Sequence, residues 1–510
     1  MTVRYWWCAA LVALFGGWAD AQTATLTSIT RSNVSITLTW DTATNMICHL
    51  DTAIDLLSTN WNEEFYICFP TQYTSVTDLR GSPPEALFYR LGAVTNQAPR
   101  GQTLLTYIPS DAGGRIAVKI VLPRLSRFPG NRAGVVVYVS GFIRSSGHFL
   151  TDSDFSSIGL IHITYLWPGA EDGTGMTSAG TYDYGGSNCI AALKQVLRFA
   201  GGQIPDLTGR YLADLAQVAP LYDNVGMCAA SHAGIAAVNA VYRYGAEVSN
   251  VVYYVGWENP TVDSLVSWDA GNIHSITPTN RLYRYPDGWS ATNIEIGYER
   301  VWWATNFLGY ALPFFDLNTN YAPDLSDYIP SEEGSLMFDK RFYSRGILHA
   351  LTNNHALAET NWPDDLATPA EADEVWAYRD TPSAYTTLLT NAPQLHVMLL
   401  CSVAGHMQPA YDKPHVHHNF NGFHNTAGLW TRLNPDGAYA AWINTNALAV
   451  PDNPANQEPA NWLDIRSWSY SNDLLTAGEA ILCGVAEMAD RVYRTNWNDN
   501  LTNVLVDYPA

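Results

Sequence analysis

Two patterns of hydrophobic and polar positions divide the chain. Residues 22–98 alternate apolar and polar side chains over short runs, such as 34–40, with turn-rich gaps between them. A period of two residues broken by frequent turns predicts a small all-β sandwich. From residue 99 onward, buried apolar runs such as 134–139 alternate with helical segments such as 188–200. That alternation predicts the α/β class, with a mainly parallel sheet covered by helices on both faces.

The α/β pattern is interrupted between about residues 260 and 390. This stretch is rich in Trp, Tyr, Asn and Pro, and at roughly 130 residues it is far longer than a connecting loop. We therefore expect an insertion with helices of its own. Buried strands resume at 394–401 and 428–435, and a helix at about 477–493 is expected to pack on the sheet. Residues 99–510 are thus predicted to form one domain that carries the insertion.

The first 21 residues have the features of a secretory signal. Arg4 supplies the positive charge, residues 5–18 are mostly apolar, and Ala19 and Ala21 give the small-x-small cleavage pattern. No other run approaches the about 18 apolar residues that a membrane-spanning helix needs. We therefore expect a secreted or periplasmic protein with no membrane span.

Charge and cysteine content narrow the classes of partner. Acidic residues outnumber basic ones 48 to 27, a net charge of −21 without a basic patch, which argues against a nucleic-acid partner. Of seven cysteines, Cys8 lies in the signal segment, which leaves an even number for an oxidising compartment. Cys48 and Cys68 lie on neighbouring strand-like segments and could pair. Cys228 and Cys401 fall in buried strands, where cysteine packs as a small apolar side chain.

Residues 224–244 form the most informative stretch. They begin as a buried apolar run, turn at Ser231 and continue with helical periodicity, and the small residues Ala229 and Ala233 allow the turn to close. Such a turn lifts a hydroxyl out of the backbone and places the next amide, that of His232, at a helix N-terminus, where it can stabilise an oxyanion. The alternative is that Ser231 caps an ordinary strand-to-helix turn.

This turn resembles the nucleophile elbow of the α/β-hydrolase family, which includes serine esterases and prolyl-oligopeptidase-like peptidases. The family has glycine at both flanking positions, where this chain has alanine. The resemblance implies an α/β-hydrolase-like fold, Ser231 as the nucleophile, and the 260–390 insertion as a cap. It also implies that the loop after the strand 134–139 supplies the second oxyanion amide, from Gly141 or Phe142.

The N-terminal segment carries a second resemblance. The Leu-Thr-Trp40 start, Trp61 and the closing residues 88–90 are similar to a fibronectin type III-like module found at the front of bacterial secreted enzymes. Because residues 22–98 contain no catalytic constellation, the resemblance implies an accessory, spacing or adhesion module.

The rest of the catalytic machinery departs from the family pattern. The family places an acid after the strand 394–401 and a histidine after the strand 428–435. Here Gly405 and His406 follow the first strand, and the loop after the second contains Asp436 but no histidine. We assign the base to His406. The acid that orients it is Glu258, at the end of the strand after the elbow helix, with Asp436 as the alternative acid.

A calcium-like loop lies inside the insertion. Oxygen-bearing side chains occupy positions 1, 3, 5, 9 and 12 of a 12-residue window, and a backbone carbonyl occupies position 7. These positions are Asp316, Asn318, Asn320, Asp324, Asp327 and, for the carbonyl, Ala322. The spacing resembles an EF-hand-like loop of secreted calcium proteins and implies a structural Ca²⁺, although Tyr321 replaces the usual glycine. The alternative is a polar surface loop.

The sequence also bears on metal and cofactor binding. A metal site built from His406, His415 and His417 or His418 is a weaker alternative, because acid and cysteine partners at useful spacing are lacking. No motif indicates an organic cofactor.

Four functions remain in order of preference. The first is cleavage of an ester in a small-molecule or polymer substrate, through an acyl-serine. The second is a peptidase of the prolyl-oligopeptidase-like type. The third is a non-catalytic protein that binds a glycan or peptide, because the family's acid and histidine positions are lost. A structural or adhesive surface protein is the last.

Overall fold

The computed structural model describes most of the chain. It covers residues 25–31, 36–41, 47–53, 62–68, 73–78, 88–94, 97–111, 114–139, 141, 149, 153–172, 175–259, 269–271, 280–284, 295–306, 308–332, 340–401, 414–443 and 475–497. The predicted signal segment 1–21, Phe142 and His406 lie outside these residues. No helix among the residues described is both long and apolar enough to cross a membrane.

Among the described residues, eleven strands belong to one sheet, in the order β16-β15-β12-β11-β9-β10-β8-β7-β4-β3-β6. The chain divides into two compact units. The first contains Met1–Tyr138, Ser145–Tyr182 and Lys194–Val225, and the second contains Val139–Arg144, Asp183–Leu193 and Gly226–Ala510. Strand β11 (Ala219–Ala230) begins in the first unit and ends in the second.

Apolar strands build the sheet in the first unit. These are β7 (Thr103–Pro109), β8 (Arg115–Val121), β9 (Arg132–Val139) and β10 (Ile161–Tyr165). Strand β10 runs parallel to β9 and antiparallel to β8. Successive valines of β9, Val135 to Val137, are fully buried. A strand buried on both faces needs no polar side, which explains why its sequence is continuously apolar.

The N-terminal strands form two groups. β1 (Thr25–Arg31), β2 (Ile36–Asp41) and β5 (Tyr73–Asp78) pair as an antiparallel three-stranded sheet. β3 (Ile47–Ala53) pairs antiparallel with both β4 (Asn62–Cys68) and β6 (Phe88–Val94). The all-β pattern predicted for this region is confirmed. In addition, β4 runs parallel to β7, so the second group extends the large sheet.

The disulfide that the sequence allows between Cys48 and Cys68 does not form in the structure. The two cysteines do lie on adjacent strands, but the register of β3 and β4 pairs Cys48 with Ile67, one residue away from Cys68. A one-residue offset turns two side chains to opposite faces of a sheet, so the two sulfur atoms cannot bond. Both thiols are buried and form no disulfide, and the same holds for Cys189, Cys228, Cys401 and Cys483. The assignment of Cys228 and Cys401 to the apolar core is confirmed.

The free cysteines give a first prediction. Burial, together with the neighbouring Cys68, raises the pKa of Cys48 to about 12, and burial and Asp206 raise the pKa of Cys68 to about 11. Because the thiolate is the reactive form, we expect no rapid reaction of a chain beginning at Gln22 with Ellman's reagent. All six thiols should react once the chain is unfolded in guanidinium. Fewer than six reactive thiols after unfolding without reductant would mean that a disulfide forms.

The second unit contains the parallel strands that follow the serine turn. β12 (Val251–Trp257) runs parallel to β15 (His396–Leu400), which runs parallel to β16 (Thr431–Leu433). Helix α11 (Ala477–Arg494) lies against β12 and β15, where Gly484 faces Val255, Met398 and Leu400. Helix α9 (Pro414–His424) contacts β15 and β16. The fold class is the predicted one, α/β with a mainly parallel sheet of the α/β-hydrolase type.

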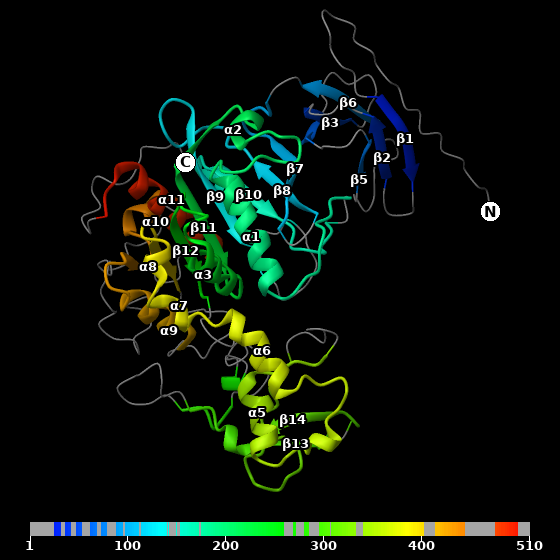
Figure 1. Ribbon diagram of the computed structural model, residues 1–510, viewed down its shortest axis with the longest axis vertical. Helices are drawn as coiled ribbons and strands as arrows, with labels where there is room; N and C mark the ends of the chain where they lie inside the picture. The colour runs from blue at the N-terminus through cyan, green and yellow to red at the C-terminus, as the bar shows by residue number, and fades with distance from the viewer. Residues whose placement is uncertain are drawn as a thin grey trace, which may run out of the picture. The chain divides into compact units, whose positions relative to one another are not determined.

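Between β12 and β15 the chain builds further elements, in the region expected to form an insertion. A hairpin of β13 (Val301–Thr305) and β14 (Ala311–Phe315) is followed by helices α5 (Arg345–Asn353), α6 (Pro369–Arg379), α7 (Pro382–Tyr385) and α8 (Leu388–Asn391). Helix α5 packs against both α6 and β13 (Figure 1). Helix α6 begins with a capping box, in which Thr368 and Glu371 exchange hydrogen bonds.

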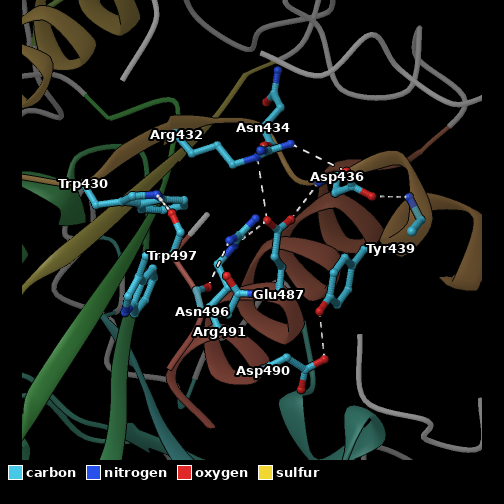
Figure 2. Close-up of polar contacts among 11 residues, drawn as sticks. Trp430, Arg432, Asn434, Asp436, Tyr439, Glu487, Asp490, Arg491, Asn496 and Trp497 are labelled. Atoms are coloured by element: carbon cyan, nitrogen blue, oxygen red, sulfur yellow. Dashed lines mark hydrogen bonds and ion pairs between the residues drawn. The ribbon is translucent and has the colours of Figure 1, made fainter. Parts of the chain in front are cut away.

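A buried ionic cluster joins β16 to α10 (Gly437–Ile443) and α11 (Figure 2). Glu487 is fully buried, and its Oε1 lies 2.8 Å from Nε of Arg491 and 3.7 Å from Nε of Arg432. Its Oε2 accepts a hydrogen bond of 2.7 Å from the backbone N–H of Asp436. On the next turn of α11, Asp490 accepts a hydrogen bond of 2.9 Å from the Tyr439 hydroxyl. The Glu487 carboxylate therefore lies beside two buried guanidinium groups and accepts a hydrogen bond from the backbone at the start of α10.

Candidate functional site

The turn at Ser231 connects β11 to α3 (Ala233–Tyr244). Ser231 has φ 53°, in the left-handed region that L-residues with a side chain rarely adopt. Its N–H donates a hydrogen bond of 2.8 Å to the carbonyl of Trp257, and its own carbonyl accepts one of 3.1 Å from Gly234. A serine held in a strained conformation between a buried strand and a helix has the backbone of a nucleophile elbow. The structure therefore has the turn that the sequence predicts, in the predicted place.

The side chain of Asn259 holds this turn by hydrogen bonds to three backbone carbonyls. Its Nδ2 donates to the carbonyl oxygens of Ser231 at 2.7 Å, Ala229 at 3.1 Å and Trp257 at 3.2 Å. Its Oδ1 accepts a hydrogen bond of 2.6 Å from the Tyr254 hydroxyl. Asn259 is only 2% exposed. One amide thus joins the end of β11, the turn itself and the end of β12.

Two glycines make room for that amide. A Cβ on Gly234 would lie 2.3 Å from Cγ of Asn259, and a Cβ on Gly256 would lie 2.1 Å from its Oδ1. Such distances are far inside van der Waals contact, so neither position can carry a side chain while Asn259 keeps its place. Sequence reasoning missed Asn259. The only available signal was the Asn itself, directly after the strand that follows the elbow helix.

We expect Asn259→Leu to slow the reaction of Ser231 with a fluorophosphonate by about 10- to 100-fold, because a displacement of about 1 Å at a nucleophile costs that much. Stability should fall by about 1–3 kcal/mol, since three carbonyls lose a buried donor. The matched control is Asn280→Leu. Asn280 is also 2% exposed, and its Nδ2 donates to the carbonyls of Asp269 and Ile296. Equal slowing by both variants would contradict a positioning role for Asn259.

The other predicted catalytic residues fall at strand ends. Glu258 directly follows β12, is 2% exposed, has φ 46°, and donates its N–H to the carbonyl of Leu400 at 3.0 Å. It lies between Trp257 and Asn259, both of which contact the backbone of Ser231. The structure therefore brings the Glu258 backbone next to the serine turn. Its assignment as the acid stays a prediction.

The oxyanion residues are placed in part. The amide of His232 lies at the N-cap of α3, immediately after Ser231. Gly141 follows β9 and is exposed, and it belongs to the same compact unit as Ser231. Phe142 and His406 lie outside the described residues, so the base and one candidate amide stay predictions.

Asp436, the alternative acid, takes part in the buried ionic cluster. Its Oδ1 accepts a hydrogen bond of 2.7 Å from the N–H of Ala438 at the start of α10, and its Oδ2 lies 3.9 Å from Nη2 of Arg432. The carboxylate is almost fully buried. These contacts give Asp436 a structural role at the end of β16.

The calcium-like loop follows β14 and has an ordered set of internal hydrogen bonds. The Asp316 carboxylate accepts hydrogen bonds from the N–H groups of Asn320 at 3.2 Å and Tyr321 at 3.0 Å. Tyr321 has φ 60°, so it adopts the left-handed conformation for which glycine is usual at this position. Hydrogen bonds from Ser326 and Asn318 lower the pKa of Asp324 to about 2. The loop backbone is therefore organised around its carboxylates.

The donor set of this loop fits a cation only in part. The side chains of Asp316 and Asp327 are buried, whereas Asn318 and Asn320 both point an Nδ2 donor at Asp324, at 2.6 and 3.1 Å. An ion in the loop would require both amide groups to turn. Across the described residues, no group of three or more His, Cys, Asp or Glu side chains is placed to hold a metal. The histidines of the alternative metal site lie on α9, apart from His406.

Comparison with known proteins gives distant structural likenesses. No protein-family model matches this chain, and no curated protein matches its sequence. Prolyl oligopeptidase B from Galerina marginata is 11% identical with a TM-score of 0.31, over 80% of this chain and 46% of that one. A fungal esterase from Rhizomucor miehei is 10% identical with a TM-score of 0.32, over 66% and 74%. Brefeldin A esterase, a bacterial homologue of human hormone-sensitive lipase, is 11% identical with a TM-score of 0.23, over 34% and 43%.

This chain spans less than half of the length of the prolyl oligopeptidase, and each of these three structures has a TM-score below 0.35. The strand order and the strained serine turn, rather than these likenesses, define the fold as α/β-hydrolase-like.

Proposed function

We propose that this protein is a serine hydrolase in which Ser231 is the nucleophile. The observation that carries the proposal is the left-handed conformation of Ser231 at the turn from β11 to α3. An N-cap serine needs extended backbone rather than a left-handed residue, so an ordinary capped turn does not explain the conformation. Strain of this kind costs about 1–3 kcal/mol and persists at functional sites because the surrounding structure enforces it.

The chemistry we propose is acyl transfer. The Ser231 hydroxyl attacks the carbonyl carbon of an ester while His406 takes its proton, and His406 then gives that proton to the departing alcohol. The backbone amides of His232 and of Gly141 or Phe142 hold the oxyanion. A water molecule then gives a proton to His406 and attacks the acyl carbon; the bond to the Ser231 oxygen breaks, His406 returns the proton to that oxygen, and the carboxylic acid leaves. Glu258 orients His406. We prefer it to Asp436, because the Asp436 carboxylate already caps α10 and faces Arg432.

One observation supports a second candidate, a non-catalytic protein that keeps the fold to bind a glycan or peptide. The segment after β16 contains no histidine, and its acid belongs to the buried ionic cluster. If His406 is not near Ser231, the serine has no base and no turnover follows.

Labelling with a fluorophosphonate probe separates these candidates. Purified protein beginning at Gln22 should be labelled in minutes, on the peptide that contains Ser231, and His406→Ala should lower the rate by at least about 10²-fold. Folded wild-type protein that stays unlabelled would exclude the hydrolase and favour the binding protein. Parallel assays with p-nitrophenyl esters and with p-nitroanilides then distinguish an esterase from a peptidase. Export, proposed from residues 1–21, is tested by locating the protein in fractionated cells.

We further propose that the loop 316–327 binds a structural Ca²⁺. The side-chain oxygens of Asp316, Asn318, Asn320, Asp324 and Asp327 would hold the ion with the carbonyl of Ala322. Millimolar Ca²⁺ should raise the melting temperature, in line with about 2.7 kcal/mol at a concentration of 100 times Kd, and EDTA should reverse the effect. Asp316→Asn should remove the response. The Ca²⁺ concentration should be 10 mM, about 10 times the Kd of a weak extracellular calcium site. A melting temperature that is the same in EDTA and at this concentration would contradict Ca²⁺ binding, and the loop would then be a polar surface loop.

A further inference from the structure

A pocket of about 480 Å³ lies within the second compact unit, where the first turn of α1 (Ser187–Ala200) meets α6. This volume is within the range of sites that hold small organic molecules. Its lining combines apolar and charged side chains, among them Phe342, Val375, Lys340, Glu371, Glu374 and Arg379. Among the described residues assigned to acyl transfer, none of Ser231, His232, Glu258 and Gly141 lines this pocket.

Two of the charges in the lining neutralise each other. The Nζ of Lys340 lies 2.5 Å from Oε1 of Glu371. The other oxygen of Glu371 accepts a hydrogen bond of 2.8 Å from the N–H of Thr368 in the capping box of α6. Although burial alone would raise the pKa of Glu371, the Lys340 ammonium and the Thr368 donors lower it. Glu371 is therefore held as a carboxylate by the fold itself.

Two more charged side chains of the lining, those of Arg379 and Asp183, hydrogen-bond the backbone where α6 meets the segment before α1. Arg379 is 5% exposed and donates to the carbonyls of Asp183, Tyr184 and Val375. The Asp183 carboxylate accepts backbone N–H groups at the start of α1, from Gly186 at 3.1 Å and Asn188 at 2.7 Å. One positive and one negative group are thus fixed by structural contacts and contribute no net charge to the pocket.

Glu374 is the remaining charged residue of the lining. It lies on α6 three residues after Glu371, so the two share a face of the helix, and it is exposed. Within the residues that the structure describes, its carboxylate makes no hydrogen bond and no ion pair. The pocket therefore has an excess of one negative charge beside the apolar side chains of Phe342, Ala367 and Val375.

We propose that this pocket binds a small organic cation, an ammonium or guanidinium group attached to an apolar body, with Glu374 as its counter-ion. The apolar side chains cover the body of the ligand. The charges of Lys340 and Arg379 are already balanced by Glu371 and Asp183, so neither cation is left to attract an anionic ligand. An anionic ligand would meet Glu374 and gain only Lys340, whose charge Glu371 already balances.

The pocket is linked to the helix that begins at the serine turn. Asn239 of α3 donates a hydrogen bond of 2.9 Å to the carbonyl of Arg379, and Arg243 lies 3.8 Å from the ring centroid of Tyr378. Asn239 is eight residues after Ser231, which is about 12 Å along a helix at 1.5 Å per residue. A substrate with a cationic group could reach from Ser231 to this pocket, and this extension rests on the proposed function. The binding of the cation in the pocket does not rest on it.

Calorimetric titration tests the proposal with three probes of similar size: 2-phenylethylammonium, 2-phenylethanol and 3-phenylpropanoate. The wild-type protein at low salt should bind the ammonium about 5-fold more tightly than the alcohol, as expected for a charge pair with an exposed carboxylate. The carboxylate probe should bind most weakly. Glu374→Gln should reduce the preference for the ammonium to about 2-fold or less.

The matched control is Asp364→Asn, which removes one exposed acid from the same region without touching the pocket and should keep the full preference. Ser231→Ala should also bind the ammonium normally, so a protein that fails to hydrolyse esters still tests this inference. Equal affinities for ammonium and alcohol, tighter binding of the carboxylate, or an unchanged preference in Glu374→Gln would each overturn it.

Discussion

Replacing Ser231 with alanine should lower kcat/KM for a p-nitrophenyl ester by at least about 10³-fold, because the acyl group then has no hydroxyl to attach to. The oxyanion amides of the turn remain, so a weak residual activity above that of water is expected. Fluorophosphonate labelling should disappear completely. Circular dichroism and the melting temperature should stay close to those of the wild type, since serine and alanine share the left-handed strain at this position.

A glycine at the same position makes this prediction sharper. Glycine adopts φ 53° without a steric cost, so Ser231→Gly should be as inactive as Ser231→Ala and more stable by about 1 kcal/mol. An inactive variant that gains stability is the sign of a residue held under strain for function. Retained turnover in either variant would move the nucleophile elsewhere, and equal stability of the alanine and glycine variants would remove the evidence for strain.

The parts of the fold that sequence could predict are those with local causes. The period-two runs predicted β1, β2, β4 and β6 but not β5, and the continuous apolar runs predicted β9, β12 and β15. The serine turn was predictable because small residues, a buried run and an Ala-rich helical period occur within 21 residues. Helices α1 and α11 also begin and end within two residues of the predicted bounds. Each of these signals lies inside one segment of the chain.

What sequence could not supply depends on register and on contacts between distant segments. The offset between Cys48 and Cys68 is set by the pairing of β3 with β4, and no local pattern reports it. Asn259 holds Ser231 across 28 residues, and only the folded sheet brings the two together. The pocket beside Glu374 needs Asp183 and Arg379 to meet across nearly 200 residues. A charged residue in a helical pattern is normally placed at the surface, which is why the burial of Glu487 was not foreseen.

Glu487→Gln should destabilise the protein by about 3–5 kcal/mol, because it removes the buried carboxylate that lies beside the guanidinium groups of both Arg432 and Arg491. Arg491 is fully buried and Arg432 is 1% exposed, so neither can recover hydration without opening the structure. Urea unfolding followed by tryptophan fluorescence measures the loss. The control is Glu359→Gln, an exposed glutamate whose carboxylate makes no hydrogen bond or ion pair with the described residues, and it should change stability by less than about 0.5 kcal/mol.

The pair variant Glu487→Met with Arg491→Met decides whether charge imbalance or lost packing causes this effect. It removes one acid and one base together, and Arg432 keeps Asp436 at 3.9 Å as its neighbouring carboxylate. Since burying an ion pair costs desolvation that its attraction only partly returns, the double variant should be more stable than Glu487→Gln and approach the wild type. A double variant as unstable as the single one would mean that the cluster stabilises the protein by its shape and hydrogen bonds. In that case the 2.7 Å hydrogen bond from the Asp436 amide to Glu487 would hold α10 to α11 together with the bond from Tyr439 to Asp490.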